Sequence, residues 1–433
     1  MQKNRPCFTG NHCWLWSALV LACIPVLLGG RGIIVGETVT SRLATVYSLA
    51  HDGTWYIDRP AEQPPNPFEP LTVDKVKTHD GRLISSKPPL MPLMMTIEYI
   101  VMRRVFGWNL ANEEDLRPIL QVMIFTLIKL PHIIGLVFFA LTLRMFVSNL
   151  RNAALLLLVF ALATPVPGYA CQLKNHTPAV AALIVALYFG LGMYADKLSP
   201  TPVRFMAFGM CSALVFTLDM PVTIFPAFLG LLLMLRFPRQ SILWCGLGAL
   251  PLLALHFGLM AAITGNPLPV QTQEEMYNFR SSYWRNPIGV DGLNERPLVY
   301  FFHSHFGRFG TFLLFPVLFL GIVGFFKGIL SRTCPARLGV LAGGGAFTIM
   351  TAYYITATNN YGGAGYGFRW HIGAVPVLLL LAMPAIGAFT KSWRWIALAL
   401  LLAISIFSAW ECMQAPWGAS HEWTCRWIFG PVN

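Results

Sequence analysis

Apolar runs alternate with polar segments along almost the whole chain of 433 residues. Several runs approach the roughly 20 residues that an α-helix needs to cross a bilayer. Pro and Gly inside some of them are compatible with spanning helices, because neighbouring helices can satisfy the freed backbone groups. We therefore predict one transmembrane domain, residues 1–433, with about eleven spanning helices near residues 14–30, 118–143, 153–168, 178–194, 204–218, 221–235, 241–263, 311–326, 338–356, 372–389 and 394–410.

The composition indicates the same class of protein. Hydrophobic residues make up 55% of the chain and charged residues 12%, whereas ordinary soluble domains carry about 25% charged residues. This difference excludes an ordinary soluble protein. It predicts an all-α polytopic membrane protein that is surrounded by membrane lipids.

Two polar segments interrupt the apolar pattern, residues 31–115 and residues 264–310. We predict that they are the first and second large outer loops. Within the first, the apolar residues 88–108 are interrupted by Glu98 and by two arginines. Such charges suit a helix along the membrane interface better than a spanning helix. The first outer loop is therefore expected to carry juxtamembrane helices.

Basic residues set the predicted orientation, because segments that face the cytoplasm carry an excess of Lys and Arg. With a cytoplasmic N-terminus and a non-spanning segment 88–108, the cytoplasmic segments hold thirteen basic residues and one acid, Asp196. That balance equals the net charge of +12 of the whole chain. The charge therefore requires no nucleic-acid partner. It predicts a multi-pass membrane protein whose N-terminus is cytoplasmic and whose site faces outward.

The polar run of residues 72–92 gathers acidic and basic side chains just before an apolar segment. Lys87 precedes two prolines, whose fixed backbone would hold the ammonium where the chain meets the membrane. There it would pair with a lipid phosphate, or snorkel to anionic headgroups without a specific ligand. Asp74 is a candidate catalytic acid, or it forms an ion pair with Lys75 that only shapes the loop.

Glu37 follows the first apolar run closely. A carboxylate at this place is a candidate general base, which accepts a proton from an acceptor hydroxyl or amine. Partial desolvation beside lipid would raise the pKa of such a group toward a useful range. The simpler interpretation is a solvated residue at the end of a helix, and Glu37 alone does not decide between the two.

Residues 357–371 form a late outer loop that ends with Arg369 before a predicted span. Four glycines in this loop allow the backbone to approach a ligand closely. Tyr361 and Tyr366 offer flat faces for a sugar ring, although aromatic residues are also common at membrane surfaces without a ligand. The loop is therefore a candidate substrate-binding segment.

Residues 169–177 place Asn175 and His176 at the outer mouth of two predicted helices. Both are candidate substrate-binding residues, while His176 also fits an interfacial histidine without a ligand. The outer histidines and acids allow a divalent metal, but no spacing calls for one. We therefore predict no metal ligand and no cofactor.

The nine cysteines include no C-x-x-C pair. Cys412 and Cys425 are candidates for a disulfide in an oxidising compartment, or for two unpaired thiols.

Together these features resemble the GT-C glycosyltransferases, in particular protein O-mannosyltransferases and the bacterial transferases that place aminoarabinose or other sugars on lipid A. The resemblance rests on a first span followed by an acid, a long outer loop, a K-P-P motif and a late R-x(6)-P. Its sequence-specific part covers residues 37–92 and 359–376. It implies a polyprenyl-phosphate-sugar donor, a lipid, glycan or protein acceptor, and transfer of a hexose or pentose on the outer, periplasmic face of the plasma (inner) membrane.

The resemblance also implies roles for three residues. The catalytic acid of the first loop corresponds to Glu37, the K-P-P lysine that approaches the donor phosphate to Lys87, and the late arginine to Arg369. In the implied reaction, the carboxylate deprotonates the acceptor and the anomeric centre inverts. The two cations stabilise the charge that grows on the leaving phosphate.

Two departures from the family pattern affect the second catalytic group. Thr38 follows Glu37, so the paired acids of the O-mannosyltransferases are absent. Where many relatives have an acid after the third span, this chain has Asn175 and His176. Asp74 is therefore our candidate for the second group.

A polytopic transporter or flippase of a lipid-linked or small polar substrate is the alternative function. Such a protein needs ionisable residues inside its spans. Here the candidates are chiefly Lys129, Asp219 and His256. Because they are few, the sequence favours the glycosyltransferase.

Overall fold

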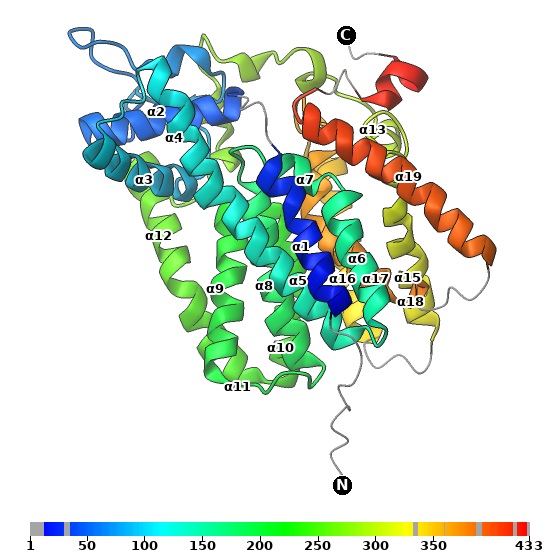
Figure 1. Cartoon of the computed structure of the whole chain (residues 1–433). Helices are drawn as coiled ribbons and strands as arrows, with labels where there is room; N and C mark the ends of the chain where they lie inside the picture. Colours follow the sequence, from blue (N-terminus) through cyan, green and yellow to red (C-terminus); the bar gives the residue numbers. More distant parts are fainter. Residues whose placement is uncertain are drawn as a thin grey trace.

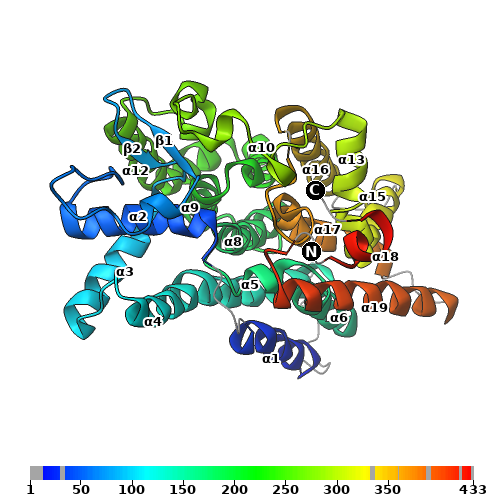
Figure 2. The same cartoon turned by 90° about the horizontal axis from the view of Figure 1, so that it is seen from above.

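The computed structural model describes residues 13–29, 35–331, 337–358, 360–386, 392–418 and 422–430. An upright bundle of helices fills most of the molecule, and helices that lie across one end of the bundle form a cap (Figure 1). Seen from that end, the cap covers one half of the bundle (Figure 2).

The bundle contains both long and broken helices. They are α1 (Cys13–Leu28), α4 (Glu113–Ile124), α5 (Leu130–Phe146), α6 (Leu150–Leu162), α8 (His176–Tyr194), α9 (Pro202–Leu218), α10 (Ile224–Arg236), α11 (Pro238–Gln240), α12 (Gly246–Thr264), α15 (Phe319–Leu330), α16 (Arg337–Ala357), α17 (Val375–Leu381), α18 (Met383–Ile386) and α19 (Ser392–Gln414). The π-helical segments Phe125–Lys129 and Ser241–Cys245 join α4 to α5 and α11 to α12.

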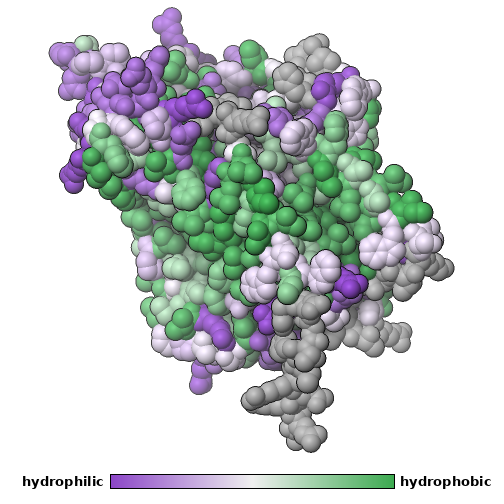
Figure 3. Space-filling view, viewed as in Figure 1, coloured by the Kyte–Doolittle hydropathy of each residue, from purple (hydrophilic) through white to green (hydrophobic). Residues whose placement is uncertain are grey.

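Six helices of the described chain are long and apolar enough to cross a membrane. They cover Glu113–Phe146, His176–Tyr194, Pro238–Thr264, Arg337–Ala357, Arg369–Ile386 and Ser392–Gln414. Five shorter apolar helices, of 10–17 residues, coincide with the other predicted spans. An apolar band crosses the middle of the molecule, and polar residues gather above it (Figure 3). The chain is thus a helical multi-pass membrane protein, while the count of eleven spans stays a prediction.

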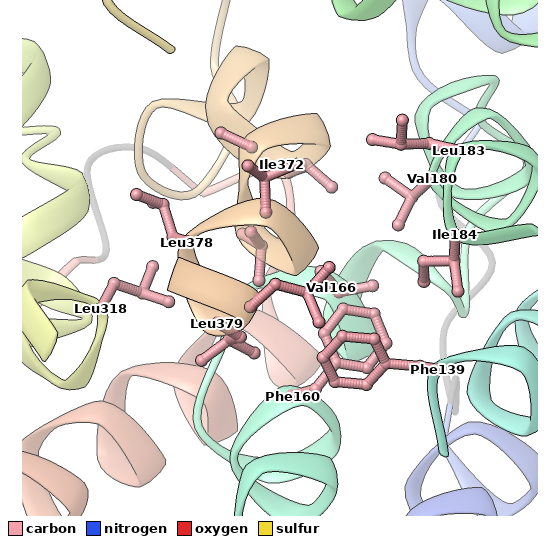
Figure 4. Packing of buried hydrophobic residues seen from close by; sticks show 14 of the residues in the cluster. Phe139, Phe160, Val166, Val180, Leu183, Ile184, Leu318, Ile372, Leu378 and Leu379 are labelled. Carbon is pink, nitrogen blue, oxygen red and sulfur yellow. The ribbon is translucent and has the colours of Figure 1, made fainter. Parts of the chain in front are cut away.

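The main buried cluster runs through the bundle, from α1, α5 and α6 through α8, α9 and α10 to α15, α16, α17 and α19. Phe139 and Phe160 pack with ring centroids 5.0 Å apart, below Val166 and beside the leucines of α17 (Figure 4). Small residues allow close helix contacts elsewhere, because a Cβ at Gly209 of α9 would lie 2.1 Å from the backbone oxygen of Cys245. The helices of the bundle therefore carry apolar side chains both on the faces that pack together and on their outer faces.

The cap is built from the first outer loop. Its helices are α2 (Glu37–Asp52) and α3 (Leu90–Phe106). Val39, Leu43 and Val46 repeat at helical spacing and are buried, which places one face of α2 against α3. Gly53 caps the C-terminal end of α2, and its φ of 67° is the left-handed conformation common at helix ends. α3 lies crosswise above the bundle in Figure 1 and is not among the apolar helices, which agrees with the predicted non-spanning segment.

A small β-hairpin stands within the first outer loop, although no strand was predicted. Strands β1 (Lys75–Lys77) and β2 (Leu83–Ser85) pair antiparallel, with Val76 opposite Ile84. The second outer loop packs on this hairpin through Val270 and Met276. It continues as short 3-10 turns and α13 (Pro297–His305).

Three predicted spans are interrupted. The segment 311–326 divides into α14 (Thr311–Leu314) and α15, because Pro316 provides no N–H to continue the helix. The segment 153–168 ends as α6 at Leu162 and resumes as the short α7 (Val166–Tyr169). The segment 372–389 breaks between α17 and α18, and its last three residues lie outside the described residues.

Cys412 and Cys425 are both buried and are free thiols. Of the two interpretations of these cysteines, the structure therefore shows unpaired thiols.

Candidate functional site

The hairpin brings the two ends of the polar run 72–92 together. Asp74 directly precedes β1, and Lys87 follows β2 by two residues. The pairing of Lys75 with Ser85 aligns the chain on both sides, and the Ser86 N–H donates to the Asp74 carbonyl at 3.1 Å. The register of the hairpin therefore places the Asp74 carboxylate beside the Lys87 ammonium.

Asp74 and Lys87 form an ion pair of 2.8 Å between Oδ2 and Nζ. The Thr38 hydroxyl donates to the same carboxylate at 3.0 Å. The carboxylate is almost fully buried, and burial acts to raise its pKa. The charges of Lys87 and Lys174 and the Thr38 hydrogen bond outweigh burial, so the pKa of Asp74 lies below its usual value. Asp74 is thus a fixed carboxylate.

Three further cations lie around this pair. Arg42 of α2 is 2% exposed, and its Nη2 donates to the Asn175 side chain at 2.7 Å, while its Nε and Nη1 have no partner. Lys174 is 3% exposed. Its ammonium lies 4.1 Å from the ring centroid of Trp417, and the Arg369 guanidinium lies 5.4 Å from the same centroid.

We call Arg42, Lys87, Lys174 and Arg369 the cation cluster. Among the described residues, Lys87 is its only member in an ion pair. Burial and the charges of the other three members lower the pKa of Lys174 well below its usual value. Burial also lowers the pKa of Lys87 and brings that of Arg42 to about 10. Because buried charges without partners are costly, the cluster is suited to bind an anion.

Phosphate oxygens match these donors best. Guanidinium groups present N–H donors in a planar fork that fits phosphate, and ammonium groups add compact positive charge. The buried Nε of Arg369 has no partner among the described residues, like two of the Arg42 nitrogens. The cluster therefore has unused donors as well as unpaired charge.

Two carboxylates stand at the edge of the cluster. Glu37, the first residue of α2, is exposed, and its carboxylate accepts a hydrogen bond from the Val73 N–H at 2.8 Å. Asp291, from the second outer loop, is half-buried, and its Oδ2 accepts a hydrogen bond from the Tyr283 hydroxyl at 3.2 Å. Burial raises the pKa of Asp291 above its usual value.

Asn175 and His176 lie beside the cluster in different ways. The Asn175 oxygen accepts from Arg42, and its amide donates to the Leu218 carbonyl at 2.6 Å. His176 is buried, and its Nδ1 lies 2.6 Å from Oδ2 of Asp219. Asn175 thus positions a cation, while His176 forms a buried pair next to the site.

Tyr361 and Tyr366 are each 1% exposed, so neither ring offers a free face in this conformation. Tyr361 stacks on Tyr300 with centroids 4.7 Å apart, and its hydroxyl donates to Glu295. The Tyr366 hydroxyl donates to Glu411 at 2.7 Å. Their suggested role as sugar-binding surfaces stays a prediction.

The structure therefore brings Asp74, Lys87, Asn175 and Arg369 together, with Glu37 and His176 at the edges, and leaves the two tyrosines apart. Sequence reasoning missed Arg42, Lys174, Asp291 and Trp417 as site residues. A charged residue on the otherwise buried face of a helix was an available signal for Arg42. Trp417 carries no comparable signal, because only the fold brings it to Lys174.

A small pocket opens beside Lys87, between the hairpin, α3 and the end of α12. It is lined by Thr45, Trp55, Ile84, Ser85, Lys87, Pro89, Pro92, Met260 and Ile263. Its walls are mainly apolar. A larger apolar groove between α8, α10, α16 and α17 shares no residue with the cation cluster.

No group of three or more His, Cys, Asp or Glu among the described residues is arranged to hold a metal ion.

Comparisons by sequence find no match, neither to a protein-family model nor to a curated protein. Among solved structures, the chain is similar to the oligosaccharyltransferase of Archaeoglobus fulgidus in its apo form, with a TM-score of 0.50 and 14% identity over 95% of this chain. The chain has the GT-C fold. It spans 56% of the length of that oligosaccharyltransferase.

ArnT from Cupriavidus metallidurans, bound to undecaprenyl phosphate, matches with a TM-score of 0.47 and 16% identity. That match covers 91% of this chain and 64% of ArnT. The oligosaccharyltransferase is a GT-C membrane glycosyltransferase, so the resemblance in the sequence is confirmed at the level of the fold.

Proposed function

We propose that the protein is a membrane glycosyltransferase, which moves a sugar from a polyprenyl-phosphate donor to an acceptor and binds the donor phosphate in the cation cluster. The observation that carries this proposal is the presence of three cations, buried Arg42 and Lys174 and half-buried Arg369, without an ion-pair partner among the described residues. The GT-C fold supports the same class of activity.

The cluster suits the chemistry of a leaving phosphate. Negative charge grows on the phosphate oxygen as the bond to the anomeric carbon breaks. Cations held in place in a water-poor site stabilise such charge without reorganising. Lys87 and Arg369 were predicted for this role, and Arg42 and Lys174 extend it. Asp74 fixes the position of Lys87 and lowers the net charge of the empty site.

The pocket beside Lys87 supports a lipid-linked donor. The phosphate would lie at Lys87, and the first isoprene units would contact Pro89, Pro92 and Met260. An apolar wall next to a phosphate site is what a polyprenyl phosphate requires, whereas a soluble nucleotide sugar has no use for it.

The proposal includes the remaining sequence predictions. A carboxylate at the edge of the cluster deprotonates the acceptor, which attacks opposite the phosphate and inverts the anomeric centre. The reaction occurs on the outer face of the inner membrane, and the N-terminus is cytoplasmic. The acceptor is a lipid, a glycan or a protein.

Binding of undecaprenyl phosphate and of undecaprenol to the protein in nanodiscs tests the proposal, because the two probes differ only in the phosphate. We expect binding of the phosphate at least tenfold tighter, and loss of that preference in K174M and R369Q. Exposed Lys77 provides the control, since K77M removes a cation of the first outer loop away from the cluster. Equal affinity for both probes would contradict the proposal.

Turnover is tested with a panel of undecaprenyl-phosphate hexoses and pentoses. Wild-type protein should release undecaprenyl phosphate from at least one panel member, and K87M should release it more slowly by about two orders of magnitude. Normal release by K87M would contradict the assigned role of Lys87.

A further inference from the structure

Asp291 is a carboxylate from far along the chain that reaches the cation cluster. The second outer loop carries it there by packing on the hairpin, and the Gln271 amide donates to the Ser86 carbonyl at 2.7 Å. The second outer loop is therefore anchored to the hairpin by a hydrogen bond as well as by apolar packing. Val290 and Leu293, close to Asp291 in the sequence, pack against the main buried cluster, so this part of the loop lies against the bundle.

One oxygen of Asp291 is held and the other faces the cluster. Oδ2 accepts the hydrogen bond from Tyr283, whose hydroxyl also lies 3.1 Å from the Ile288 carbonyl. Oδ1 lies 3.6 Å from the point that a Cβ on Gly363 would occupy, and Nη2 of Arg369 lies 3.6 Å from the same point. Asp291 and Arg369 form no direct ion pair, so the absent Cβ leaves room between them.

The other carboxylates at the site are engaged differently. Asp74 is locked by Lys87 and Thr38, and its lowered pKa makes it a weak base. Glu37 is exposed, and its carboxylate already accepts the Val73 N–H at the start of α2. The pKa of Asp291 is shifted upward by burial and by Asp74, and downward by Tyr283, Arg369 and Lys87, with burial the largest effect. Environments that separate the pKa values of neighbouring carboxylates commonly separate their roles.

We propose that Asp291 is the general base that takes the proton of the acceptor hydroxyl, and that Tyr283 positions it; this inference rests on the proposed function. The acceptor oxygen forms the new bond to the anomeric carbon as its proton moves to Oδ1 of Asp291. The bond between the anomeric carbon and the donor phosphate breaks, and its electron pair stays on the phosphate oxygen, next to Arg369 and Lys174. In this arrangement the acceptor reaches the site between the second outer loop and Gly363.

Two neighbours of Tyr283 in the loop carry buried polar atoms. Ser282 Oγ and Trp284 Nε1 are buried and have no hydrogen-bond partner among the described residues. They flank Tyr283 in the sequence, and the ring centroids of Tyr283 and Trp284 lie 5.2 Å apart.

The D291N variant separates donor binding from proton transfer. We expect D291N to bind undecaprenyl phosphate as wild type does, and to release it from the active panel donor about 100-fold more slowly. Y283F should lower kcat and leave the affinity for undecaprenyl phosphate unchanged, and D291E should recover part of the rate. The matched control is E274Q, which changes an exposed acid of the same loop. Normal turnover by D291N would overturn the inference.

Carbodiimide labelling tests the placement of Asp291 without turnover. Dicyclohexylcarbodiimide reacts preferentially with carboxyls of raised proton affinity, so peptide mass spectrometry should find Asp291 modified faster than Glu274. Undecaprenyl phosphate should protect Asp291, and undecaprenol should not. If undecaprenyl phosphate binds but leaves the labelling of Asp291 unchanged, the inference fails while the proposed function stands. If undecaprenyl phosphate does not bind in preference to undecaprenol, the proposed function itself fails.

Discussion

The Lys87 ammonium lies 2.8 Å from the Asp74 carboxylate, and the pairing of β1 with β2 holds the two residues in register. This pair anchors the cation cluster, because Asp74 is the only carboxylate among the described residues that neutralises a member of it directly. The charge balance of the site therefore depends on one side chain.

The first prediction concerns that balance. D74N leaves the whole cation cluster without a bound counter-ion, and removing one partner of a buried pair costs about 3 kcal/mol. We expect D74N to lower the thermal stability of the purified protein more than K87M does. In the double variant D74N/K87M the loss should be smaller than the sum of the two single losses, since the pair is then removed as a unit. Additive losses would show that the pair contributes no coupling.

The second prediction concerns Lys174, where stability and binding should change in opposite directions. K174M removes a buried charge that other cations repel, so the empty protein should become more heat-stable. The same variant should gain less stability than wild type when undecaprenyl phosphate is added, because a ligand donor to a charged group contributes about 1.5–3 kcal/mol. Melting curves of both proteins with and without undecaprenyl phosphate provide the comparison. A K174M protein that is less stable when empty would contradict the argument from charge repulsion.

The third prediction is a pH dependence. The lowered pKa of Lys174 means that its ammonium loses its proton at lower pH than an exposed lysine does, and only the ammonium attracts phosphate. Affinity for undecaprenyl phosphate should therefore be highest below this pKa and fall as the pH rises through it. Binding should take up a proton, because the bound phosphate raises the pKa again.

Titrations of binding between pH 7.5 and about pH 10 measure this effect, since the second pKa of a phosphate monoester is about 6 and the ligand charge is then constant. Arg42, whose pKa burial lowers to about 10, contributes at the upper end, and the pKa of Lys87 is lowered as well. K174R keeps its charge and should show a flatter profile. Equal profiles for K174R and wild type would assign the pH dependence to another group.

The fourth prediction concerns Trp417, whose ring lies near both Lys174 and Arg369. Each cation–π contact of this kind contributes about 0.5–2 kcal/mol. W417L should therefore weaken binding of undecaprenyl phosphate by about tenfold, and W417F should weaken it less, because phenylalanine keeps a smaller π face. Exposed Trp410 of α19 provides the control, and W410L should bind as wild type does. Equal binding by W417L and wild type would show that the indole does not position the cations.

The membrane class and the predicted crosswise helix followed from the periodicity and placement of apolar residues. Leu90–Phe106 carries charges that interrupt its apolar pattern, and it forms one helix outside the apolar set. The interruptions of the predicted spans were less accessible. Proline is tolerated in many membrane helices. Pro251 lies inside α12, whereas Pro316 interrupts the helix between α14 and α15. Which outcome occurs depends on tertiary packing, which local sequence does not report.

The candidate site was only partly predictable for a related reason. Asp74 and Lys87 belong to one polar run, and the K-P-P motif drew attention to Lys87. Arg42 lies 133 positions before its partner Asn175. Lys174 contacts the ring of Trp417, a residue much later in the sequence. Such pairings form only when the bundle assembles, and no spacing rule in the sequence encodes them.

The position of a bound phosphate tests the central claim most directly. A cryo-electron microscopy structure of the wild-type protein in nanodiscs with undecaprenyl phosphate would show the headgroup. We predict that its phosphorus lies within hydrogen-bonding reach of Lys87, Lys174 and Arg369, with the prenyl chain leaving past Pro89. A phosphate bound elsewhere, with the cation cluster unchanged, would contradict the account.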